Sequence, residues 1–277
     1  MAEQIPLESP GVATSAGDMD RSEEVAPDLS YKKTAIANVA FYGRPGEAGW
    51  VLIDAGMPGS AEAIYRAAAE RFGENVPPSA IVLTHGHFDH VGALPELAAE
   101  WQTPIYAHWQ EHPFLTGARA YPPPPKGTGG VGMGQLWGQG RLKPVNVSRW
   151  LGLLSGNAGV PFMPGWRVIP TPGHSPGHVS LWREADRTLI AGDAVISTRQ
   201  ECAYATLTQK PELQGPPRHY TQEWDAARDS ARRLAALGPE LLLTGHGPAL
   251  RGAEMREALK FLAEDFDQIA RPGRIRT

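Results

Sequence analysis

The most informative stretch of this chain is Thr84-His85-Gly86-His87-Phe88-Asp89-His90. It places three imidazoles and a carboxylate within six residues, directly after the apolar run 81–83. The run predicts a short buried strand, so the histidines would lie in the loop at its end. Imidazole and carboxylate groups at this density are typical of a metal site, with zinc as first choice and iron or manganese as alternatives. Solvated or helix-capping histidines are the competing interpretation.

Further candidate ligands follow other short apolar runs. His174 comes after the run 168–169, Asp193 after 189–192 and His246 after 241–245. A glycine directly precedes each of them, and glycine allows unusual backbone angles and close approach. Loops of this kind can direct side chains into one cleft. The pattern therefore predicts a centre in which two metals are neighbours.

These motifs together make the chain similar to the metallo-β-lactamase superfamily. Its pattern is a His-x-His-x-Asp-His loop followed by an isolated His, an Asp and a last His, and the match runs from about Tyr31 to the C-terminus. The resemblance implies the fold class α+β, as a four-layer αββα sandwich in which two sheets pack face to face with helices outside.

The resemblance also divides the ligands between two divalent metals. It implies three histidines on one metal, an aspartate and two histidines on the other, and one bridging aspartate. These are His85, His87 and His174, then Asp89, His90 and His246, and finally Asp193.

Two more residues match supporting positions of the family. Asp54 ends the run 50–53 and is expected either to orient a ligand imidazole or to cap the strand. His178, four residues after His174, is expected to support the site or to be a hydrogen-bonded core histidine. Three other histidines fit no position of the pattern and are assigned to surface or loop positions: His108, His112 and His219.

Apolar periodicity predicts the elements between these motifs. Strands are expected at 34–42, 50–53, 81–83, 166–169, 179–182, 188–191 and 241–243. Helices are expected at 60–72, 92–101, 222–237 and 254–269.

The domain organisation is predicted to be one catalytic domain, 31–277, after an acidic tail or arm, 1–30. The tail carries seven acids against one base. Residues 112–165 contain five bases and no acid, together with a Gly- and Pro-rich run. Such a long segment without periodicity is typical of a lid or binding loop. We expect a cationic lid that attracts an anionic or polar substrate while Trp137 and Trp150 hold an apolar tail; a homodimer interface is the alternative.

Composition narrows the partners and the location. The chain has a net charge of −4, which disfavours nucleic acid as a partner. It has no long apolar segment that would span a membrane, and no pattern of a secretory signal. Its single cysteine, Cys202, excludes an internal disulfide and fits a reducing cytoplasm.

The predicted activity is that of a dinuclear metal-dependent hydrolase that cleaves a small ester, lactone or thioester. Two cations that share a hydroxide lower the pKa of that water towards about 7 and polarise the substrate oxygen. Asp89 is both a ligand and the candidate catalytic acid, because its second oxygen could pass a proton to the leaving group.

Alternatives within and outside this activity stay open. Known β-lactamases of the family generally lack an aspartate at the position of Asp193, which disfavours antibiotic hydrolysis. Glyoxalase II enzymes carry a helical domain after the last histidine, whereas this chain has 31 residues after His246. Lactonases of the family have a tyrosine where this chain has Ile196. Tyr204 is a candidate replacement for that tyrosine. A phosphodiesterase or β-lactamase-like hydrolase, a mononuclear iron dioxygenase acting on persulfides, and a scaffold with a silent metal site are the rivals.

Overall fold

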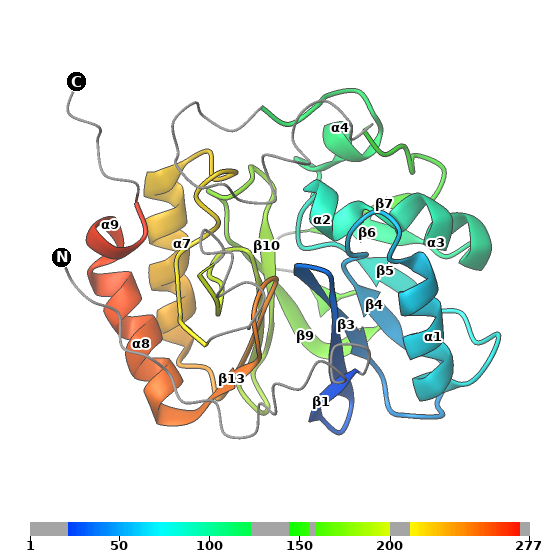
Figure 1. Ribbon diagram of the computed structural model, residues 1–277, viewed down its shortest axis with the longest axis horizontal. Coiled ribbons are helices and arrows are strands. Elements are labelled where there is room, and N and C mark those ends of the chain that lie inside the picture. Colours follow the sequence, from blue (N-terminus) through cyan, green and yellow to red (C-terminus); the bar gives the residue numbers. More distant parts are fainter. Residues whose placement is uncertain (1–21, 123–143, 156–158, 200–210, 272–277) are drawn as a thin grey trace. The chain divides into compact units, whose positions relative to one another are not determined.

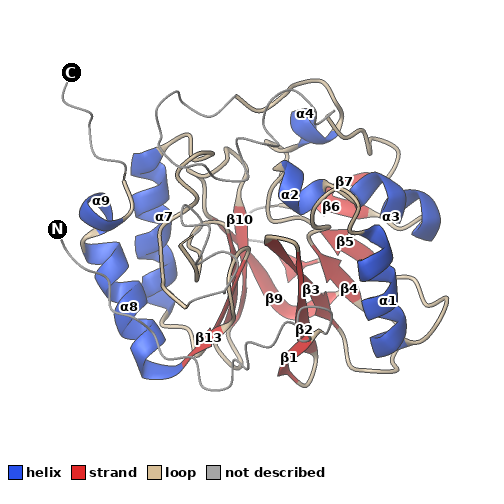
Figure 2. Cartoon of the chain, in the orientation of Figure 1, coloured by secondary structure: helices blue, strands red, loops and turns tan. Residues whose placement is uncertain are grey.

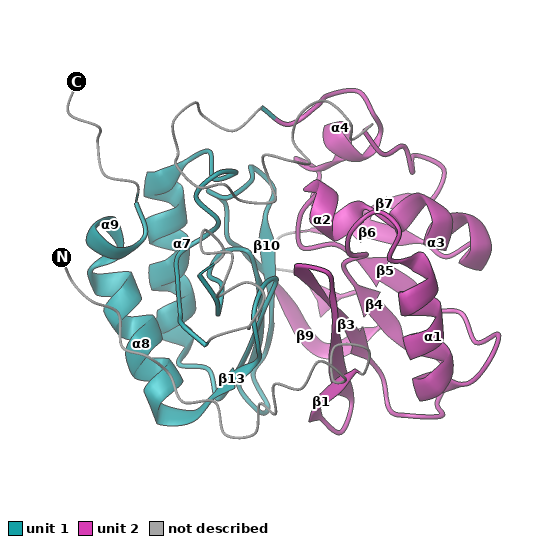
Figure 3. Cartoon of the chain, viewed as in Figure 1, with its two compact units in different colours: residues 1–11, 122–142, 169–277 teal, residues 12–121, 143–168 magenta. Residues whose placement is uncertain are grey.

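The computed structural model describes residues 22–122, 144–155, 159–199 and 211–271. The chain divides into two compact units, each discontinuous in sequence (Figure 3). Unit 1 comprises Met1–Gly11, Pro122–Leu142 and Ile169–Thr277, and unit 2 comprises Val12–Tyr121 and Lys143–Val168. Each unit has its own strands, helices and apolar core.

Among the described residues, unit 2 has a seven-stranded sheet whose strands follow one another in sequence order (Figure 1). Strands β1 to β4 pair antiparallel, and β4 to β7 pair parallel. The carboxyl ends of β4, β5 and β6 therefore lie at one edge of the sheet, so the loops after them are neighbours. The bounds are β1 Glu23–Ala26, β2 Leu29–Thr34, β3 Ala37–Tyr42, β4 Val51–Ile53, β5 Ala80–Val82, β6 Ile105–Ala107 and β7 Leu151–Leu153.

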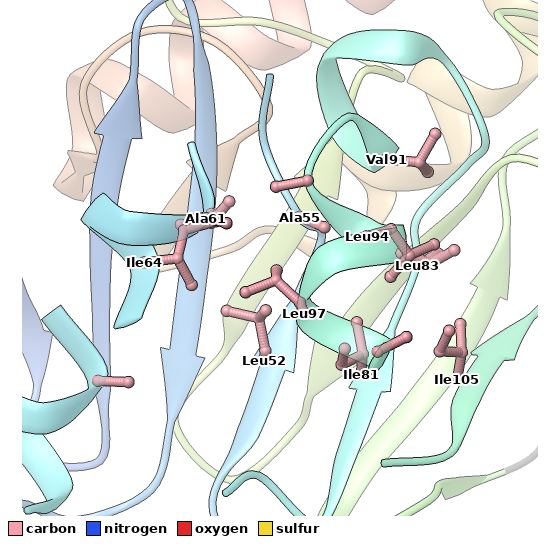
Figure 4. Packing of buried hydrophobic residues seen from close by; sticks show 14 of the residues in the cluster. Leu52, Ala55, Ala61, Ile64, Ile81, Leu83, Val91, Leu94, Leu97 and Ile105 are labelled. Carbon is pink, nitrogen blue, oxygen red and sulfur yellow. The ribbon is translucent and has the colours of Figure 1, made fainter. Parts of the chain in front are cut away.

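An apolar core joins the helices of unit 2 to its central strands. Ile64 of α1 and Leu94 and Leu97 of α3 belong to one buried cluster with Leu52 of β4 and Ile81 of β5 (Figure 4). Burying one such side chain contributes about 1.5–3 kcal/mol, so this cluster holds the strands whose ends carry the candidate site. The helices are α1 Ala61–Phe72, α2 Phe88–Val91, α3 Leu94–Trp101 and α4 His112–Leu115.

The N-terminal boundary of the fold lies before Tyr31. Residues 23–30, which the charge pattern assigns to the tail, form β1 and the start of β2. The Tyr31 hydroxyl donates to Glu23 Oε2 over 2.7 Å, and Glu24 pairs with Arg71 of α1. The acids of this segment are therefore on an edge strand with partners in the unit, which charge counting does not reveal. Residues 1–21, the rest of the predicted tail, lie outside the described residues.

The segment 112–165 contributes elements of its own at both ends. It begins with α4 and later forms β7, which pairs with β6, and the hairpin of β8 (Gly159–Val160) and β9 (Met163–Pro170). Trp150 packs partly buried against the core of unit 2. The predicted lid bases Lys126, Arg141 and Lys143 lie outside the described residues, as does Trp137.

Unit 1 places helices beside a second group of strands (Figure 2). Strands β10 and β11 pair antiparallel, β11 and β12 pair parallel, and β12 and β13 pair antiparallel. Ala231 and Leu234 of α7 and Leu259 of α8 share a buried cluster with Leu189 and Leu242. The bounds are β10 Val179–Arg183, β11 Thr188–Gly192, β12 Leu241–Thr244, β13 Leu250–Arg251, α7 Trp224–Leu237, α8 Gly252–Glu264 and α9 Phe266–Ile269.

The predicted elements are confirmed except at two places. The single strand expected at 34–42 is wrong at its start, because Ala35 has a φ of 60° and forms the turn between β2 and β3. The last helix, expected at 254–269, is interrupted at Asp265 between α8 and α9. The prediction does not contain the short elements β1, β2, β6, β7, β8, β13, α2 and α4. Within the described ranges, no helix is both long and apolar enough to cross a bilayer.

Candidate metal centre

The predicted metal loop of unit 2 follows β5, and its histidines lie against one another. The ring centroids of His85 and His87 are 4.8 Å apart, and those of His85 and His90 are 4.3 Å apart. Asp89 and His90 belong to the short helix α2, which starts directly after His87. All four side chains are buried. Their burial excludes solvated histidines, and His87, the N-cap residue of α2, makes no capping hydrogen bond with its side chain, so neither form of the competing interpretation fits.

Asp54, at the end of β4, holds this loop through three hydrogen bonds. The Thr84 backbone N–H donates to Oδ1 over 2.8 Å, and the Thr84 hydroxyl donates to Oδ2 over 2.8 Å. His90 Nδ1 lies 2.9 Å from the same Oδ2. Asp54 has a φ of 59°, a left-handed conformation that aspartate tolerates better than most residues. The expected orienting role is therefore the one that this geometry supports, rather than a strand-end cap.

These contacts determine which nitrogen of each imidazole carries the proton. Because the Thr84 hydroxyl gives its proton to Asp54, it can only accept from His85 Nδ1, which lies 3.0 Å away. His90 Nδ1 must likewise donate, because Asp54 Oδ2 is an acceptor. In the neutral form of both side chains, Nε2 therefore has the lone pair that a metal needs.

Unit 1 contains the three remaining candidate ligands, each after a strand. His174 follows β9, Asp193 follows β11 and His246 follows β12. Asp193 Oδ2 lies 3.1 Å from His246 Nε2 and 3.3 Å from His174 Nε2. The structure thus brings these three buried side chains together around one carboxylate oxygen.

The histidines of unit 1 are oriented by hydroxyl groups and backbone. The Thr221 hydroxyl donates to Pro217 O over 2.7 Å, so it accepts from His174 Nδ1 at 3.1 Å. Thr244 donates to the carbonyl oxygen of His246 over 2.7 Å and thereby fixes the His246 loop. The close approach of the His174 loop to α7 requires Gly173, since an added Cβ would lie 2.3 Å from Ala227 N.

His178 supports Asp193 through the backbone. Its Nε2 accepts the Asp193 backbone N–H over 2.9 Å, so its Nδ1 carries the proton that is shared with Thr171 Oγ1 at 2.8 Å. Both ring nitrogens are thus used within the protein. The expectation that His178 supports the site rather than binding metal agrees with these contacts.

Two residues that the sequence pattern does not single out, Glu111 and Tyr121, also contact the loop of unit 2. Glu111 Oε2 accepts the Gly86 backbone N–H over 2.9 Å, and the Tyr121 hydroxyl donates to the same oxygen. Glu111 is the last acid before the acid-free segment, which is the signal in the sequence that could have indicated it.

The histidines without a position in the family pattern lie outside these groups of ligands. His112 begins α4, and its Nε2 lies 3.1 Å from Ala107 O. Burial, with a smaller contribution from His112, lowers the pKa of His108 below its usual value. His219 is half-buried in the turn before α7. Cys202 and Tyr204 lie outside the described residues.

The donor groups fit a divalent metal. They are imidazole nitrogens and carboxylate oxygens, all buried, and the Nδ1 atoms of His85, His90 and His174 have hydrogen-bond partners that direct Nε2 to the ligand role. Such buried polar groups cost stability unless they are hydrogen-bonded or bound to metal. Zinc, iron and manganese all accept this ligand set.

Comparison with known proteins gives three findings. The model of the "Metallo-beta-lactamase superfamily" matches residues 34–246. The probable metallo-hydrolase YflN of Bacillus subtilis is 44% identical over 248 residues, which cover 89% of this chain and 94% of that protein. A hydroxyacylglutathione hydrolase of Xanthomonas axonopodis is 28% identical over 204 residues, which cover 73% of this chain and 58% of the relative.

Solved structures agree with the family model. TTHA1623, solved by crystallography in a di-iron-bound form, matches with a TM-score of 0.55 and 27% identity, covering 82% of this chain and 95% of that one. The predicted fold class, an α+β sandwich of the metallo-β-lactamase type, is confirmed.

The family model matches residues 34–246, which is most of the chain. The relative that is 44% identical aligns with 89% of this chain. The chain is therefore a metal-dependent hydrolase that belongs to the metallo-β-lactamase superfamily.

Proposed function

We propose that the chain is a dinuclear metal-dependent hydrolase that cleaves a small ester, lactone or thioester. In this proposal the ligands of unit 1 and unit 2 act together, and one aspartate serves both ions. Following the family pattern, one ion would be held by His85, His87 and His174, the other by Asp89, His90 and His246, and Asp193 would serve both.

One observation within unit 1 carries this proposal. Asp193 Oδ2 lies at nearly equal distances, 3.1 and 3.3 Å, from the Nε2 atoms of His246 and His174, which the family pattern assigns to different ions. A carboxylate oxygen between two such nitrogens suits a bridging ligand. A single ion could also bind these three atoms as two imidazoles and one carboxylate, so the number of ions bound per chain is the test.

The metal identity is proposed from chemistry and from one relative. Two ions of this class lower the pKa of bound water towards about 7, polarise the substrate oxygen and stabilise the leaving group. Zinc is our first choice for a site of imidazoles and carboxylates. The di-iron form of TTHA1623 supports two positions and keeps iron as the alternative.

The chain's own residues divide the remaining work. Asp54 and Thr84 orient His85 and His90, and His178 fixes the backbone at Asp193. Asp89 would hold an ion, and its second oxygen would take the proton that the attacking water or hydroxide gives up and pass it to the leaving group. Among substrates, the name of the Xanthomonas relative supports a thioester, because acylglutathione is a thioester.

Elemental analysis of the purified protein, combined with two ligand variants, tests the proposal. We expect about two divalent ions per chain, and His87→Ala and His246→Ala should each lose one. His219→Ala, which changes a histidine outside the ligand set, is the matched control and should keep both ions. A panel of thioester, lactone, ester, phosphodiester and β-lactam substrates then identifies the bond. One iron per chain, together with oxygen uptake on a glutathione persulfide, would replace the proposal by a dioxygenase.

A further inference from the structure

The Glu111 side chain makes an unusual contact for a buried carboxylate. It lies at the residue before α4, is 0% exposed, and accepts the N–H of Gly86 over 2.9 Å. Gly86 stands between the two ligand histidines His85 and His87, so this hydrogen bond acts on the backbone that separates them. A buried carboxylate is costly unless hydrogen bonds satisfy it, which makes this partner specific.

Tyr121 contacts the same part of the loop as Glu111. Its hydroxyl donates to the same Glu111 oxygen. Its ring stacks on Phe114 of α4, with centroids 3.8 Å apart and planes 10° apart, and lies 4.3 Å from the ring of His87. The tyrosine therefore contacts a ligand imidazole directly and reaches the carboxylate that holds the loop.

The space between these side chains is narrow at position 86. A Cβ added to Gly86 would lie 2.9 Å from the Tyr121 hydroxyl oxygen and 3.2 Å from Glu111 Oε2. Both atoms thus lie beside Gly86, and a larger residue there would displace the ends of these two side chains.

From these contacts we propose that Glu111 and Tyr121 are a pair of positioning residues that set the separation and orientation of His85 and His87 for metal binding. This inference rests on the proposed function. Asp54 holds the loop through Thr84, His85 and His90, whereas Glu111 and Tyr121 act at Gly86 and His87. The pair should therefore affect the ion assigned to His85 and His87 more than the ion assigned to Asp89 and His90.

Cobalt titration of the metal-free full-length chain tests the inference without relying on turnover. Visible absorption of Co²⁺ reports each ion's coordination, and competition with a chelator gives its affinity. Glu111→Ala should lower the affinity for one of the two ions about 10- to 100-fold, which is the range for losing a group that hydrogen-bonds to a metal ligand. Glu111→Gln keeps an oxygen that can accept from Gly86 and should restore most of that affinity. Tyr121→Phe keeps the ring and should cost a few-fold.

Matched controls separate positioning from general damage. Glu74→Ala changes an exposed glutamate of unit 2, and Tyr106→Phe changes a half-buried tyrosine on β6; both should leave the cobalt spectrum unchanged. Circular dichroism of the metal-free proteins checks folding. If Glu111→Ala does not fold, Tyr121→Phe measured against Tyr106→Phe decides the question.

Two results would overturn the inference. One is a folded Glu111→Ala protein, or a Tyr121→Phe protein, with both cobalt affinities within twofold of wild type. The other is an equal loss at both ions. If the wild-type chain binds fewer than two ions, or His87→Ala binds as wild type does, the proposed function fails first. If only the Glu111 and Tyr121 variants are without effect, the hydrolase proposal stands and the positioning role is rejected.

Discussion

The two groups of candidate ligands are built in opposite ways. In unit 2, four ligands occur within six positions of one loop, between 85 and 90. In unit 1, three ligands are spread from 174 to 246 and follow three different strands. A compact motif depends on support from neighbouring loops, whereas a dispersed set depends on the pairing of its strands. Damage at one supporting residue should therefore affect the two groups differently.

The supporting groups differ in chemistry as well. Around the loop of unit 2 they are the carboxylates of Asp54 and Glu111. Around the ligands of unit 1 they are the Thr221 hydroxyl and the His178 imidazole. A carboxylate that accepts from Nδ1 makes the imidazole a better ligand than a hydroxyl does. We therefore expect the supporting groups of unit 2 to contribute more to metal affinity than those of unit 1.

The largest effect should come from removing the carboxylate at the centre of the unit 1 group. Asp193→Ala removes the oxygen that lies near both His174 and His246, and turnover should fall by more than about 100-fold, beyond the usual range for an outer partner. Steady-state kinetics and metal content measure this. Asp186→Ala, at the start of the same β11 hairpin, is the control. Unchanged metal content in Asp193→Ala would reject the bridging role.

The next effect should come from the supporting carboxylate of unit 2. Asp54→Ala leaves the Thr84 hydroxyl and His90 Nδ1 without their acceptor, so metal affinity should fall about 10- to 100-fold. Chelator competition measures the affinity, with the exposed Glu74→Ala as control. If the affinity equals that of wild type, Asp54 does not orient the ligand histidines and only caps the end of its strand.

A smaller effect is expected for the corresponding support in unit 1. His178→Ala removes the acceptor of the Asp193 backbone N–H, and a neutral hydrogen bond of this kind contributes about 0.5–1.5 kcal/mol. Metal affinity should therefore fall about 2- to 13-fold, less than in Asp54→Ala. If His178→Ala has the larger effect of the two, the proposed difference between the units is wrong.

The smallest effect should be on stability, at the far end of β11 from Asp193. Burial raises the pKa of Asp186, but hydrogen bonds from Arg183 and Thr188 outweigh it and lower the pKa below 3.8. A carboxylate whose pKa is lowered on folding stabilises the folded state at pH values above its ordinary pKa. This contribution disappears as the pH falls through the lowered pKa. Asp186→Asn should therefore cost less than about 1 kcal/mol at pH 7, because the pair is partly exposed.

Urea unfolding at pH 7 and below pH 3.8 measures that difference, with metal removed in both proteins. The gap between Asp186→Asn and wild type should narrow at the lower pH. A constant gap would mean that the hydrogen bond to the Thr188 backbone, rather than the charge, is responsible.

Much of the candidate site could be predicted because its signals are local. The three histidines and the aspartate of the loop share one short stretch, and each later ligand follows an apolar run and a glycine. The places where prediction failed needed contacts across the chain. The turn at Ala35 depends on the pairing of β2 with β3, and β1 depends on partners such as Tyr31 and Arg71.

By itself the sequence determined the longer helices and most of the strands that precede the site, the candidate ligands and the superfamily, because apolar periodicity and ligand spacing are properties of neighbouring residues. Only the tertiary structure decided which groups support those ligands. Asp54 reaches Thr84 and His90 across 30 and 36 positions, and Glu111 reaches Gly86 across 25. Such contacts arise where strand ends meet at one edge of a sheet, and so do the proton positions on the histidines that make Nε2 available to metal.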